Sequence, residues 1–403
     1  MRVSQALILA GGLGTRLGKK TLKCPKPMLL VNGEPFLNNI IWNLKRQGIN
    51  KIVLSIGYLA EDFKEYYGNK TNMGVDIRFI VEEKQLGTGG AIKRCEDLLD
   101  EYFFLINGDT ICDINFHDLS STFVENKIGN LALNYVEDVS RYGEVNLEGK
   151  DIISFKEKSE SNSGYINSGV GLFSKKLIDY IPLKNSSLEK NIFPKLIKNK
   201  LLTASKYNSF FIDIGIPISL REAQTLIPRW KSKPALLLDR DGVINIDYGY
   251  VHSFENFEWI EDAKETIKFA NDLGILVIVI TNQSGIARGF YSEEDFKIFT
   301  NDINNLLIHS GAHIDATYFC PHHPKEGIGE FRKNCDCRKP KSGMFKKAIF
   351  EWNLDKKRCF FIGDKDSDIV AASNIGLASH LFSYKHENLL EIVRENLTYL
   401  KIK

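Results

Sequence analysis

Leu7-Ile-Leu-Ala-Gly-Gly-Leu-Gly-Thr-Arg-Leu17 joins an apolar run of strand-forming residues to a glycine-rich turn. Glycines without side chains let backbone N–H groups come close to phosphate oxygens, and Arg16 adds a fixed positive charge at the same turn. Many strands end in glycine-rich turns for structural reasons alone, so this stretch leaves a purely structural role open. It predicts an α/β domain that begins with a buried strand and binds a phosphate-bearing ligand.

Short apolar runs alternate with longer amphipathic stretches along the chain, a pattern typical of α/β folds with a mostly parallel sheet. Strands are expected at Ala6–Leu9, Lys51–Ile56, Ile77–Val81, Phe103–Ile106, Leu131–Val136, Ala235–Leu238, Ile275–Ile280, Ala316–Phe319 and Cys359–Ile362. The 403 residues exceed the usual size of one domain. We expect two Rossmann-like α/β domains, 1–227 and 235–403. Between them, 228–234 should form a linker, because its flanking prolines disfavour regular structure.

The composition fits an enzyme that acts on small molecules. Lysine plus arginine number 53 against 51 for aspartate plus glutamate, a net charge of +2, which predicts no binding of nucleic acid or membrane. Leu276–Ile280 is far shorter than the roughly 20 residues of a membrane-spanning helix, and Met1–Ala10 lacks the cleavage region of a signal peptide. Single cysteines at 24, 95, 112 and 359 suit a reducing cytoplasm. A homo-oligomer is compatible with this sequence.

Other polar residues in the first half fit a nucleotide site. Lys26 stands between two prolines, a stiff mounting for a charge aimed at a phosphate. Gln85-Leu-Gly-Thr-Gly-Gly90 offers a second flexible cradle at the start of a helix. Asp109 and Asp213 each end an apolar strand, where open α/β sheets place ligand chemistry, and two carboxylates there can bind Mg²⁺. Each aspartate alone would equally suit a turn.

Together these residues resemble the sugar-1-phosphate nucleotidyltransferase family, from Met1 to about Leu226. The match includes Gly11-Gly-Leu-Gly-Thr-Arg-Leu17, Pro25-Lys-Pro27, Glu157-Lys158 and Asn167-Ser-Gly169. The resemblance implies a GT-A-like fold and attack of a sugar phosphate on the α-phosphorus of a nucleoside triphosphate. It assigns the triphosphate to Gly11, Gly12, Gly14, Thr15, Arg16 and Lys26, the base or sugar to Gln85, Gly87 and Gly90, the sugar to Glu157 and Asn167, and Mg²⁺ to Asp109 and Asp213.

The second half places two carboxylates one residue apart after an apolar strand, at Leu236-Leu-Leu-Asp239-Arg-Asp241-Gly242. Such a pair can supply a nucleophile and a general acid/base for phosphate chemistry. A calcium loop is the alternative, but the residues after Gly242 lack its further ligands. Thr281 follows a second strand, Arg338 and Lys339 supply cations, and Asp364 follows another strand.

This order of motifs resembles the haloacid-dehalogenase-like (HAD-like) phosphatases, from about Ala235 to the end. The resemblance implies that Asp239 forms an aspartyl-phosphate, that Asp241 is the general acid/base, and that Thr281 and Lys339 bind phosphate. It also implies Mg²⁺ at Asp239, the Asp241 backbone carbonyl and Asp364. A closer match to heptose bisphosphate phosphatases assigns substrate contacts to Asp247, Asn282, Gln283, Ser284, Arg338, Lys339 and Lys365.

Cys320, His322, Cys335 and Cys337 form a clustered set of three thiols and an imidazole. Four such ligands suit tetrahedral zinc, and a closed four-ligand site is usually structural because no position remains for water. His323 is the alternative ligand. Because Arg338 and Lys339 follow Cys337 directly, zinc should fix where these cations meet substrate. This loop, with the adjoining Arg-Lys, resembles the zinc loop of heptose bisphosphate phosphatases and of their histidinol-phosphate phosphatase relatives.

The presence of both predicted activities on one chain restricts which substrates the two domains can share. A sugar nucleotidyltransferase needs the anomeric phosphate, so its partner phosphatase should remove a different phosphate from a bisphosphate. The whole chain resembles bifunctional enzymes that dephosphorylate heptose 1,7-bisphosphate at C7 and join heptose 1-phosphate to GMP from GTP. The alternatives are a mannose or hexose 1-phosphate nucleotidyltransferase fused to another phosphatase, such as one for histidinol phosphate, and a non-catalytic protein that binds nucleotide sugars.

Overall fold

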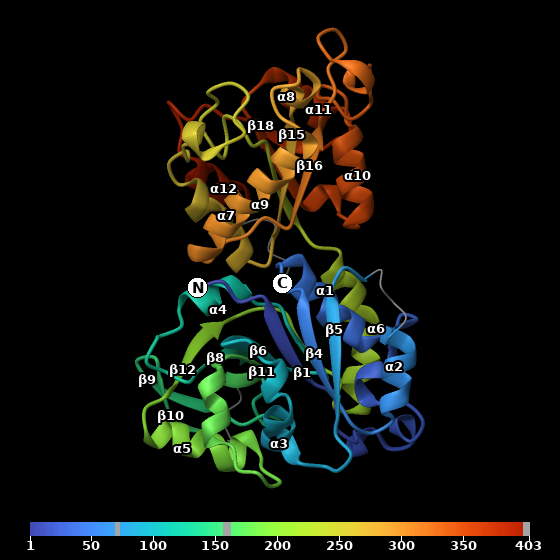
Figure 1. Ribbon diagram of the computed structural model, residues 1–403, viewed down its shortest axis with the longest axis vertical. Coiled ribbons are helices and arrows are strands. Elements are labelled where there is room, and N and C mark those ends of the chain that lie inside the picture. Colours follow the sequence, from blue (N-terminus) through green and yellow to red (C-terminus); the bar gives the residue numbers. More distant parts are fainter. Residues whose placement is uncertain (69–72, 156–162, 398–403) are drawn as a thin grey trace. The chain divides into compact units, whose positions relative to one another are not determined.

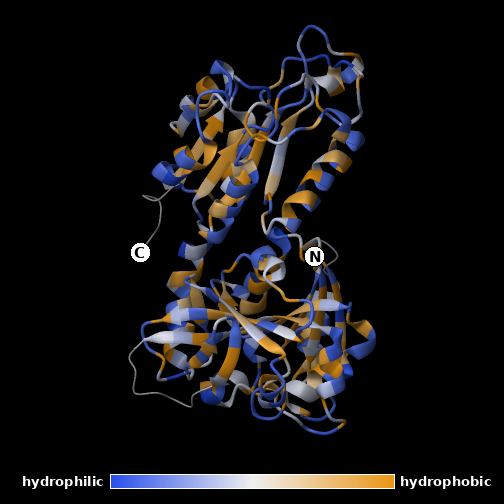
Figure 2. Ribbon diagram, turned by 90° about the vertical axis from the view of Figure 1, so that its left-hand side faces the viewer, coloured by the Kyte–Doolittle hydropathy of each residue, from blue (hydrophilic) through white to orange (hydrophobic). Residues whose placement is uncertain are grey.

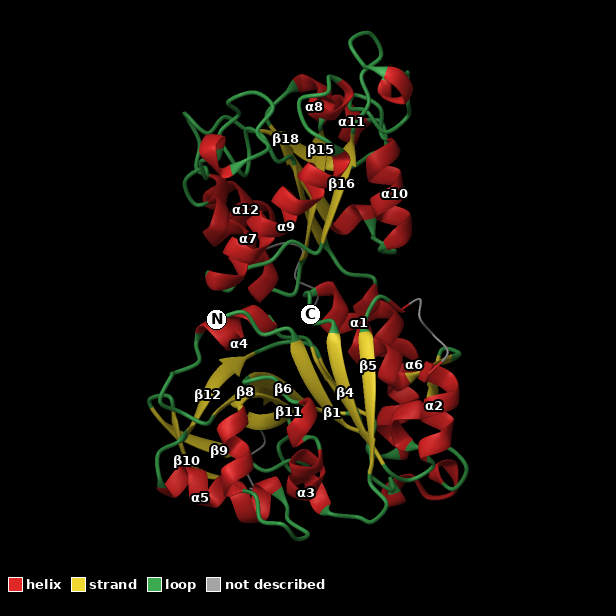
Figure 3. Ribbon diagram, viewed as in Figure 1, coloured by secondary structure: helices red, strands yellow, loops and turns green. Residues whose placement is uncertain are grey.

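The computed structural model describes residues 1–68, 73–155 and 163–397, and the chain divides into two units, Met1–Pro228 and Arg229–Lys403. Each unit combines a central sheet with helices (Figures 1 and 3). Within the described residues, no helix is both long enough and apolar enough to cross a membrane.

The strands of the first unit are β1 (Gln5–Leu9), β2 (Leu30–Val31), β3 (Glu34–Pro35), β4 (Lys51–Ile56), β5 (Asp76–Val81), β6 (Tyr102–Asn107), β7 (Thr110–Cys112), β8 (Gly129–Val136), β9 (Val145–Glu148), β10 (Asp151–Phe155), β11 (Gly164–Ser174), β12 (Leu202–Tyr207) and β13 (Phe211–Asp213). Its α-helices are α1 (Phe36–Arg46), α2 (Ala60–Gly68), α3 (Gly87–Arg94), α4 (Phe116–Ser121), α5 (Phe193–Lys198) and α6 (Pro217–Lys231), which extends past the unit boundary.

Nine of these strands form one sheet in the order β5-β4-β1-β6-β11-β8-β12-β10-β9. β5, β4, β1 and β6 are mutually parallel, as expected, whereas β11 is antiparallel to both β6 and β8. Because β8 is antiparallel to β11, it runs in the same direction as β6, and β12 is parallel to β8. The prediction of a mostly parallel sheet is therefore confirmed, and β11 and β10 are the strands of this sheet that run in the opposite direction. Parallel β1 and β6 place the first glycine-rich turn and Asp109 at the same edge, where open α/β sheets bind ligands.

The second unit contains β14 (Ala235–Leu238), β15 (Leu276–Asn282), β16 (Ala316–Cys320), β17 (Cys359–Gly363) and β18 (Ala378–Leu381). Its α-helices are α7 (Ala263–Asp272), α8 (Ser284–Ala287), α9 (Glu293–His309), α10 (Gly343–Glu351), α11 (Asp366–Ser373) and α12 (Leu389–Leu397). The strands form a parallel sheet in the order β16-β15-β14-β17-β18.

Both faces of this second sheet are buried, which explains its continuous apolar runs. On β14, Leu236 and Leu238 pack into a core that includes Ile267 of α7, whereas Leu237 packs on the other face with Phe345 of α10. Several strands of the second unit are orange, the hydrophobic end of the scale, in Figure 2, and others are paler. A strand buried on both faces is recognisable from sequence because nearly all of its residues are apolar. Across both units, all nine predicted strands are confirmed to within two residues at each end.

The segment at Pro228 differs from the expectation of an irregular linker, because α6 continues through Pro228 to Lys231. Proline lacks the N–H that would bond to the carbonyl four residues earlier, at Gln224. That carbonyl instead accepts a hydrogen bond from Asn32 Nδ2 at 2.8 Å, and the Gln224 side chain bonds to Asn32 N and Leu30 O. The proline is tolerated because a distant turn supplies the missing donor.

Candidate functional site

The first glycine-rich turn lies between β1 and a 3₁₀ helix, Thr15–Thr21. Gly14 has a φ of +62°, in the left-handed region, and a Cβ there would lie 2.9 Å from Thr21 Cγ2 and 3.1 Å from Lys26 Cβ. Glycine therefore lets the turn lie against the Lys26 segment. Gly12 has open space where a side chain would stand, and Arg16 is exposed. The turn can accept an anion beside Lys26.

Lys26 lies between the two aspartates predicted to bind Mg²⁺. Its Nζ forms an ion pair with Asp109 and lies 3.9 Å from Asp213 Oδ1. The pairing of β7 with β13 brings the aspartates together, because Thr110 lies opposite Asp213. Asp213 Oδ2 also contacts Arg141 Nη2 at 2.9 Å and accepts a hydrogen bond from the Tyr142 hydroxyl group at 3.1 Å.

These two carboxylates fit a divalent cation. A Cβ on Gly215 would lie 2.6 Å from Asp213 Oδ1 and 3.2 Å from Lys26 Nζ, so glycine leaves the space beside them open. Carboxylate oxygens are the ligands that Mg²⁺ prefers, and it is usually bound by one or two of them together with substrate phosphates. Lys26 is then placed to meet the same phosphates.

The second cradle, Gln85–Gly90, leads into α3 and is held by a distant segment. Gly89 N donates to Ser186 O at 2.8 Å, and Asn185 Nδ2 donates to Gln85 O at 3.0 Å. Gly87 has a φ of +70°, and a Cβ there would lie 2.5 Å from Ser186 O. Close packing against residues 185–186 thus requires Gly87, whatever its role toward a base or sugar. The side chain of Gln85 is exposed.

Three adjacent parallel strands assemble the site of the second unit. Asp239 follows β14, Thr281 lies near the end of β15, and Asp364 follows β17. Buried Lys339 approaches them from the loop before α10: its Nζ lies 2.8 Å from Asp239 Oδ2 and 2.8 Å from Asp368 Oδ1. It also donates to the Ile280 carbonyl at 2.8 Å.

The site of the second unit contains more carboxyl groups than positively charged groups. Burial raises the pKa of the Asp239 carboxyl group to about 7, with Lys339 opposing the rise and Asp368 adding to it. Burial also raises the pKa of Asp364 to about 6. Oxygens of Asp239, Asp364 and Asp368 lie within 4.8 Å of one another, and Asp364 Oδ1 is buried without a hydrogen-bond partner. A divalent cation fits this oxygen set and would relieve the repulsion.

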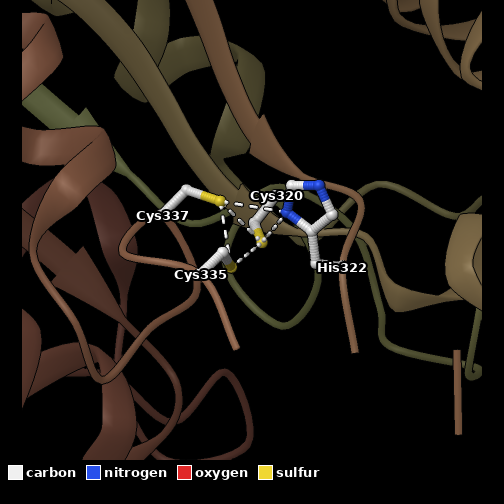
Figure 4. Close-up of side chains that lie close together, drawn as sticks. All are labelled: Cys320, His322, Cys335 and Cys337. Carbon is white, nitrogen blue, oxygen red and sulfur yellow. Dashed lines mark hydrogen bonds between the residues drawn. The ribbon is translucent and has the colours of Figure 1, made fainter. Parts of the chain in front are cut away.

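The predicted zinc ligands converge on one point (Figure 4). The thiol sulfurs of Cys320, Cys335 and Cys337 lie 3.1–3.5 Å apart, and His322 Nδ1 lies 3.3 Å from Cys337 Sγ and 3.7 Å from Cys320 Sγ. Ligands of a tetrahedral site with Zn–S bonds of about 2.3 Å lie ~3.7 Å apart, so the set fits zinc closely. His323 Nδ1 instead accepts hydrogen bonds from two backbone N–H groups.

Comparisons with known proteins agree with this geometry. The model of the nucleotidyl transferase family matches residues 5–229, and a HAD-hydrolase-like model matches residues 336–385. The chain belongs to the nucleotidyltransferase family. Its second unit is related to HAD-like phosphatases, so the chain is a bifunctional enzyme, which disfavours the non-catalytic alternative.

Relatives of each unit carry specific names. A Campylobacter jejuni D-glycero-alpha-D-manno-heptose 1-phosphate guanylyltransferase is 38% identical over 53% of this chain and 95% of its own length. A Haemophilus ducreyi D-glycero-beta-D-manno-heptose-1,7-bisphosphate 7-phosphatase is 46% identical over 36% of this chain and 80% of its own. The crystal structure of HddC from Yersinia pseudotuberculosis complexed with GMP-PN is 33% identical, with a TM-score of 0.51 over 56% of this chain and 100% of that chain.

In the nucleotidyltransferase unit, the structure describes one of the two residues predicted to contact the sugar. Asn167 lies on β11, where its Oδ1 accepts a hydrogen bond from Gly169 N at 3.1 Å. Glu157 lies outside the described residues. Their roles toward a sugar stay predictions.

In the phosphatase unit, Asp247 and Lys365 form an ion pair at 2.9 Å, and Lys365 also lies 3.6 Å from Asp364. Arg338 Nη1 donates to the His322 carbonyl at 3.2 Å, which ties this cation to the zinc loop. The Asn282 amide group instead bonds to both the N–H and C=O of Lys339, at 3.1 and 3.2 Å. Asn282 therefore fixes the Lys339 backbone, and Ser284 begins α8.

Two acidic residues of these sites have no role assigned from the sequence, although Asp368 belongs to the acidic run that follows the predicted strand Cys359–Ile362. Asp368 is buried and ion-paired to Lys339, and only its place in the acidic run Asp364-Lys-Asp-Ser-Asp368 could have indicated it. Glu82 directly follows β5, as Asp109 closely follows β6, so the rule that selected Asp109 could also have selected Glu82. A Cβ on Gly11 would lie 2.7 Å from Glu82 Oε1, which places this carboxylate against the first cradle.

Proposed function

We propose that the phosphatase unit removes the C7 phosphate of D-glycero-D-manno-heptose 1,7-bisphosphate and that the nucleotidyltransferase unit converts the resulting heptose 1-phosphate and GTP into GDP-heptose and pyrophosphate. One observation carries the proposal: relatives of the two units act, by name, on a heptose 1,7-bisphosphate and on a heptose 1-phosphate. The product of the first reaction is thus the acceptor of the second.

In the phosphatase unit, a carboxylate oxygen of Asp239 attacks the phosphorus of the C7 phosphate. The P–O7 bond breaks, and O7 takes a proton from Asp241. Water then attacks the aspartyl-phosphate and gives a proton to Asp241, which releases phosphate and restores Asp239. Lys339 and the Thr281 hydroxyl group neutralise and hold the phosphate oxygens. A divalent cation, here assigned as Mg²⁺ on Asp239, Asp364 and the Asp241 carbonyl, would lower the repulsion between the two anions.

In the nucleotidyltransferase unit, a phosphate oxygen of heptose 1-phosphate attacks the α-phosphorus of GTP, and the bond to the bridging oxygen of pyrophosphate breaks. No protein nucleophile is needed, so the unit acts by positioning and by charge stabilisation. Lys26 and Arg16 neutralise charge on the triphosphate beside the glycine-rich turn. Asp109 and Asp213 would hold Mg²⁺, which would neutralise charge on the phosphates.

The anomer follows from the bonds that change. Neither reaction breaks the C1–O1 bond, so the configuration at C1 is the same in the bisphosphate and in the nucleotide sugar. The Haemophilus ducreyi phosphatase is named for the β anomer and the Campylobacter jejuni transferase for the α anomer. If both units act in sequence, one must differ from its relative. We assign the α anomer to both, because the phosphatase reacts at C7, far from C1.

Incubation of the protein with α-heptose 1,7-bisphosphate, Mg²⁺ and GTP should release both phosphate and pyrophosphate and give GDP-heptose, identified by mass. The β bisphosphate should give no pyrophosphate, and ATP or UTP should replace GTP poorly. Release of neither product from either anomer would contradict the bifunctional proposal. Pyrophosphate release from the β anomer alone would overturn the anomer assignment and leave the reaction types standing.

Glu82 supports guanine as the base. Its carboxylate accepts a hydrogen bond from Ser55 Oγ at 2.8 Å, and burial raises its pKa, with Ser55 opposing the rise. Guanine presents two adjacent donors, N1–H and N2–H₂, and a carboxylate accepts from both. Adenine, cytosine and uracil offer no such pair of adjacent donors.

We therefore expect Glu82→Gln to lower kcat/KM for GTP by about 10- to 100-fold, the scale of one bidentate contact. The loss should be smaller with ITP, whose base lacks the 2-amino group. Glu83→Gln, which changes the exposed neighbour, is the matched control. An unchanged ratio of GTP to ITP use in Glu82→Gln would exclude this carboxylate from base selection.

The Cys320/His322/Cys335/Cys337 cluster should bind a single equivalent of zinc per chain, because a closed set of this kind contributes directly to folding. Cys335→Ser should lower both zinc content and the thermal midpoint of the phosphatase unit, and phosphate release should fall with them. Nucleotidyl transfer should persist. Cys24→Ser, in the first unit, is the control. Loss of nucleotidyl transfer alone, after chelation and restoration of Mg²⁺, would contradict the assignment.

A further inference from the structure

We propose that Gln283 is a positioning residue of the phosphatase, whose single amide group orients both Asp241 and Thr281. This inference rests on the proposed phosphatase reaction, in which Asp241 moves protons and Thr281 contacts the phosphate. The resemblance to heptose bisphosphate phosphatases implies that Gln283 contacts substrate. Its side chain instead lies in the interior, where the residue is only 2% exposed.

Both N–H directions of the Gln283 amide group are occupied by the two groups that it would orient. Nε2 donates to Asp241 Oδ2 at 3.0 Å and to Thr281 Oγ1 at 2.9 Å. Asp241 follows β14 and Thr281 lies on β15, so this amide links the ends of two neighbouring strands. One side chain thereby fixes the spacing between the acid/base and the phosphate-binding hydroxyl group.

The amide orientation is itself determined by surrounding donors. The Tyr291 hydroxyl group donates to Gln283 Oε1 at 2.6 Å, and Arg240 Nη2 reaches the same oxygen at 3.4 Å. A rotated amide would turn its oxygen toward the Asp241 carboxylate and its N–H₂ group toward these donors, which is unfavourable at both ends. Burial raises the pKa of Tyr291 to about 12, so its hydroxyl group keeps its proton.

This arrangement has a direct consequence for Thr281. Because its oxygen accepts the hydrogen bond from Gln283, the hydroxyl hydrogen stays available to donate elsewhere. A phosphate oxygen at the end of β15 is the acceptor that the proposed reaction supplies. Without Gln283, the hydroxyl group could rotate toward other acceptors.

Asp241 is fixed from both sides. Arg240 Nη2 lies 2.8 Å from Oδ1 and 2.9 Å from Oδ2, and Asn245 Nδ2 donates to Oδ1 at 3.0 Å. Gln283, which directly follows the neighbouring strand β15, adds the contact on Oδ2. Arg240 and Asn245 come from the same loop as Asp241, so Gln283 is the contact among these that ties the carboxylate to β15.

The test compares two substrates that differ in their need for a proton. In a Gln283→Met protein, a side chain of similar shape removes the donors. The first-turnover rate of P–O7 cleavage in heptose 1,7-bisphosphate should fall about 10²-fold, the scale of general acid catalysis. The first-turnover release of p-nitrophenol from p-nitrophenyl phosphate, whose leaving group needs no proton, should stay within several-fold of the wild-type rate. First-turnover rates are compared because the later attack of water on the aspartyl-phosphate uses Asp241 with both substrates. KM should rise for both substrates, because Thr281 is no longer aimed at phosphate.

Tyr291→Phe repeats the test with the Gln283 side chain still present, because it removes the hydroxyl group that donates to Gln283 Oε1. If Gln283→Met does not fold, Tyr291→Phe serves as the test by itself. We expect the ratio of the two first-turnover rates to change in the same direction, by a smaller factor. Thr266→Val, a buried polar position on α7, is the control for lost polar packing and should leave that ratio unchanged.

Equal loss of the first-turnover rate with both substrates, or no loss with either, would overturn the inference. A wild-type protein that is inactive on both phosphates would instead overturn the proposed phosphatase reaction, and this inference with it.

Discussion

Asp239→Asn should abolish phosphate release from heptose 1,7-bisphosphate while nucleotidyl transfer from supplied heptose 1-phosphate continues. The amide cannot form the aspartyl-phosphate, and loss of a covalent nucleophile lowers kcat on the order of 10⁴-fold or more. Buried Lys339 keeps Asp368 as a carboxylate partner, so the variant should fold. Phosphate and pyrophosphate release, measured separately on the same preparation, provide the check.

Asp366→Asn is the matched control, because Asp366 is an exposed acid in the same acidic segment. It should leave both activities near wild type. If Asp239→Asn also stopped nucleotidyl transfer, the two sites would not be independent. If phosphate release survived, the nucleophile would have to be another group.

Lys26→Ala should give the opposite result, with nucleotidyl transfer lost and phosphate release retained. Lys26 lies between Asp109 and Asp213 beside the first cradle, so its removal eliminates a cation at the phosphates and leaves two carboxylates facing each other. Loss of one preorganised charge contact costs about 10²- to 10³-fold in kcat. Pyrophosphate release with saturating GTP and Mg²⁺ measures the effect.

Lys64→Ala tests whether the effect is specific to the site, since Lys64 is a lysine of α2 whose partner is the exposed Glu61. Lys64→Ala should leave the rate of pyrophosphate release unchanged within experimental error. A Lys26→Ala protein that retained transfer would show that Arg16 and the metal suffice to stabilise the leaving pyrophosphate, contrary to the role assigned to Lys26.

Much of the fold could be predicted because its signals are local. The strand Ala235–Leu238 was recognisable because both of its faces are buried, which makes every residue apolar. Asp239 follows this strand directly, so its place at the sheet edge follows from strand order alone. The close spacing of Cys335 and Cys337, and of Cys320 and His322, likewise predicts a metal site from the sequence alone.

Other features depend on contacts between distant segments, which composition and periodicity do not record. Pro228 is accommodated in α6 because Asn32 satisfies the carbonyl that it leaves without a donor. The antiparallel pairing of β11 with β6 and β8 reflects strand order in space. Both depend on residues far apart in the chain.

The two sites likewise have features that the sequence predicts and features that depend on contacts between distant segments. The sequence by itself determined the residue types that phosphate chemistry requires and the strand ends that present them. Only the tertiary structure decided that Asp368 completes the acidic cluster, that Glu82 lies against Gly11, and that Gln283 is an interior residue. The physical reason is that a side chain's role depends on the donors and acceptors that fill its hydrogen-bonding directions, and these come mostly from other strands and loops.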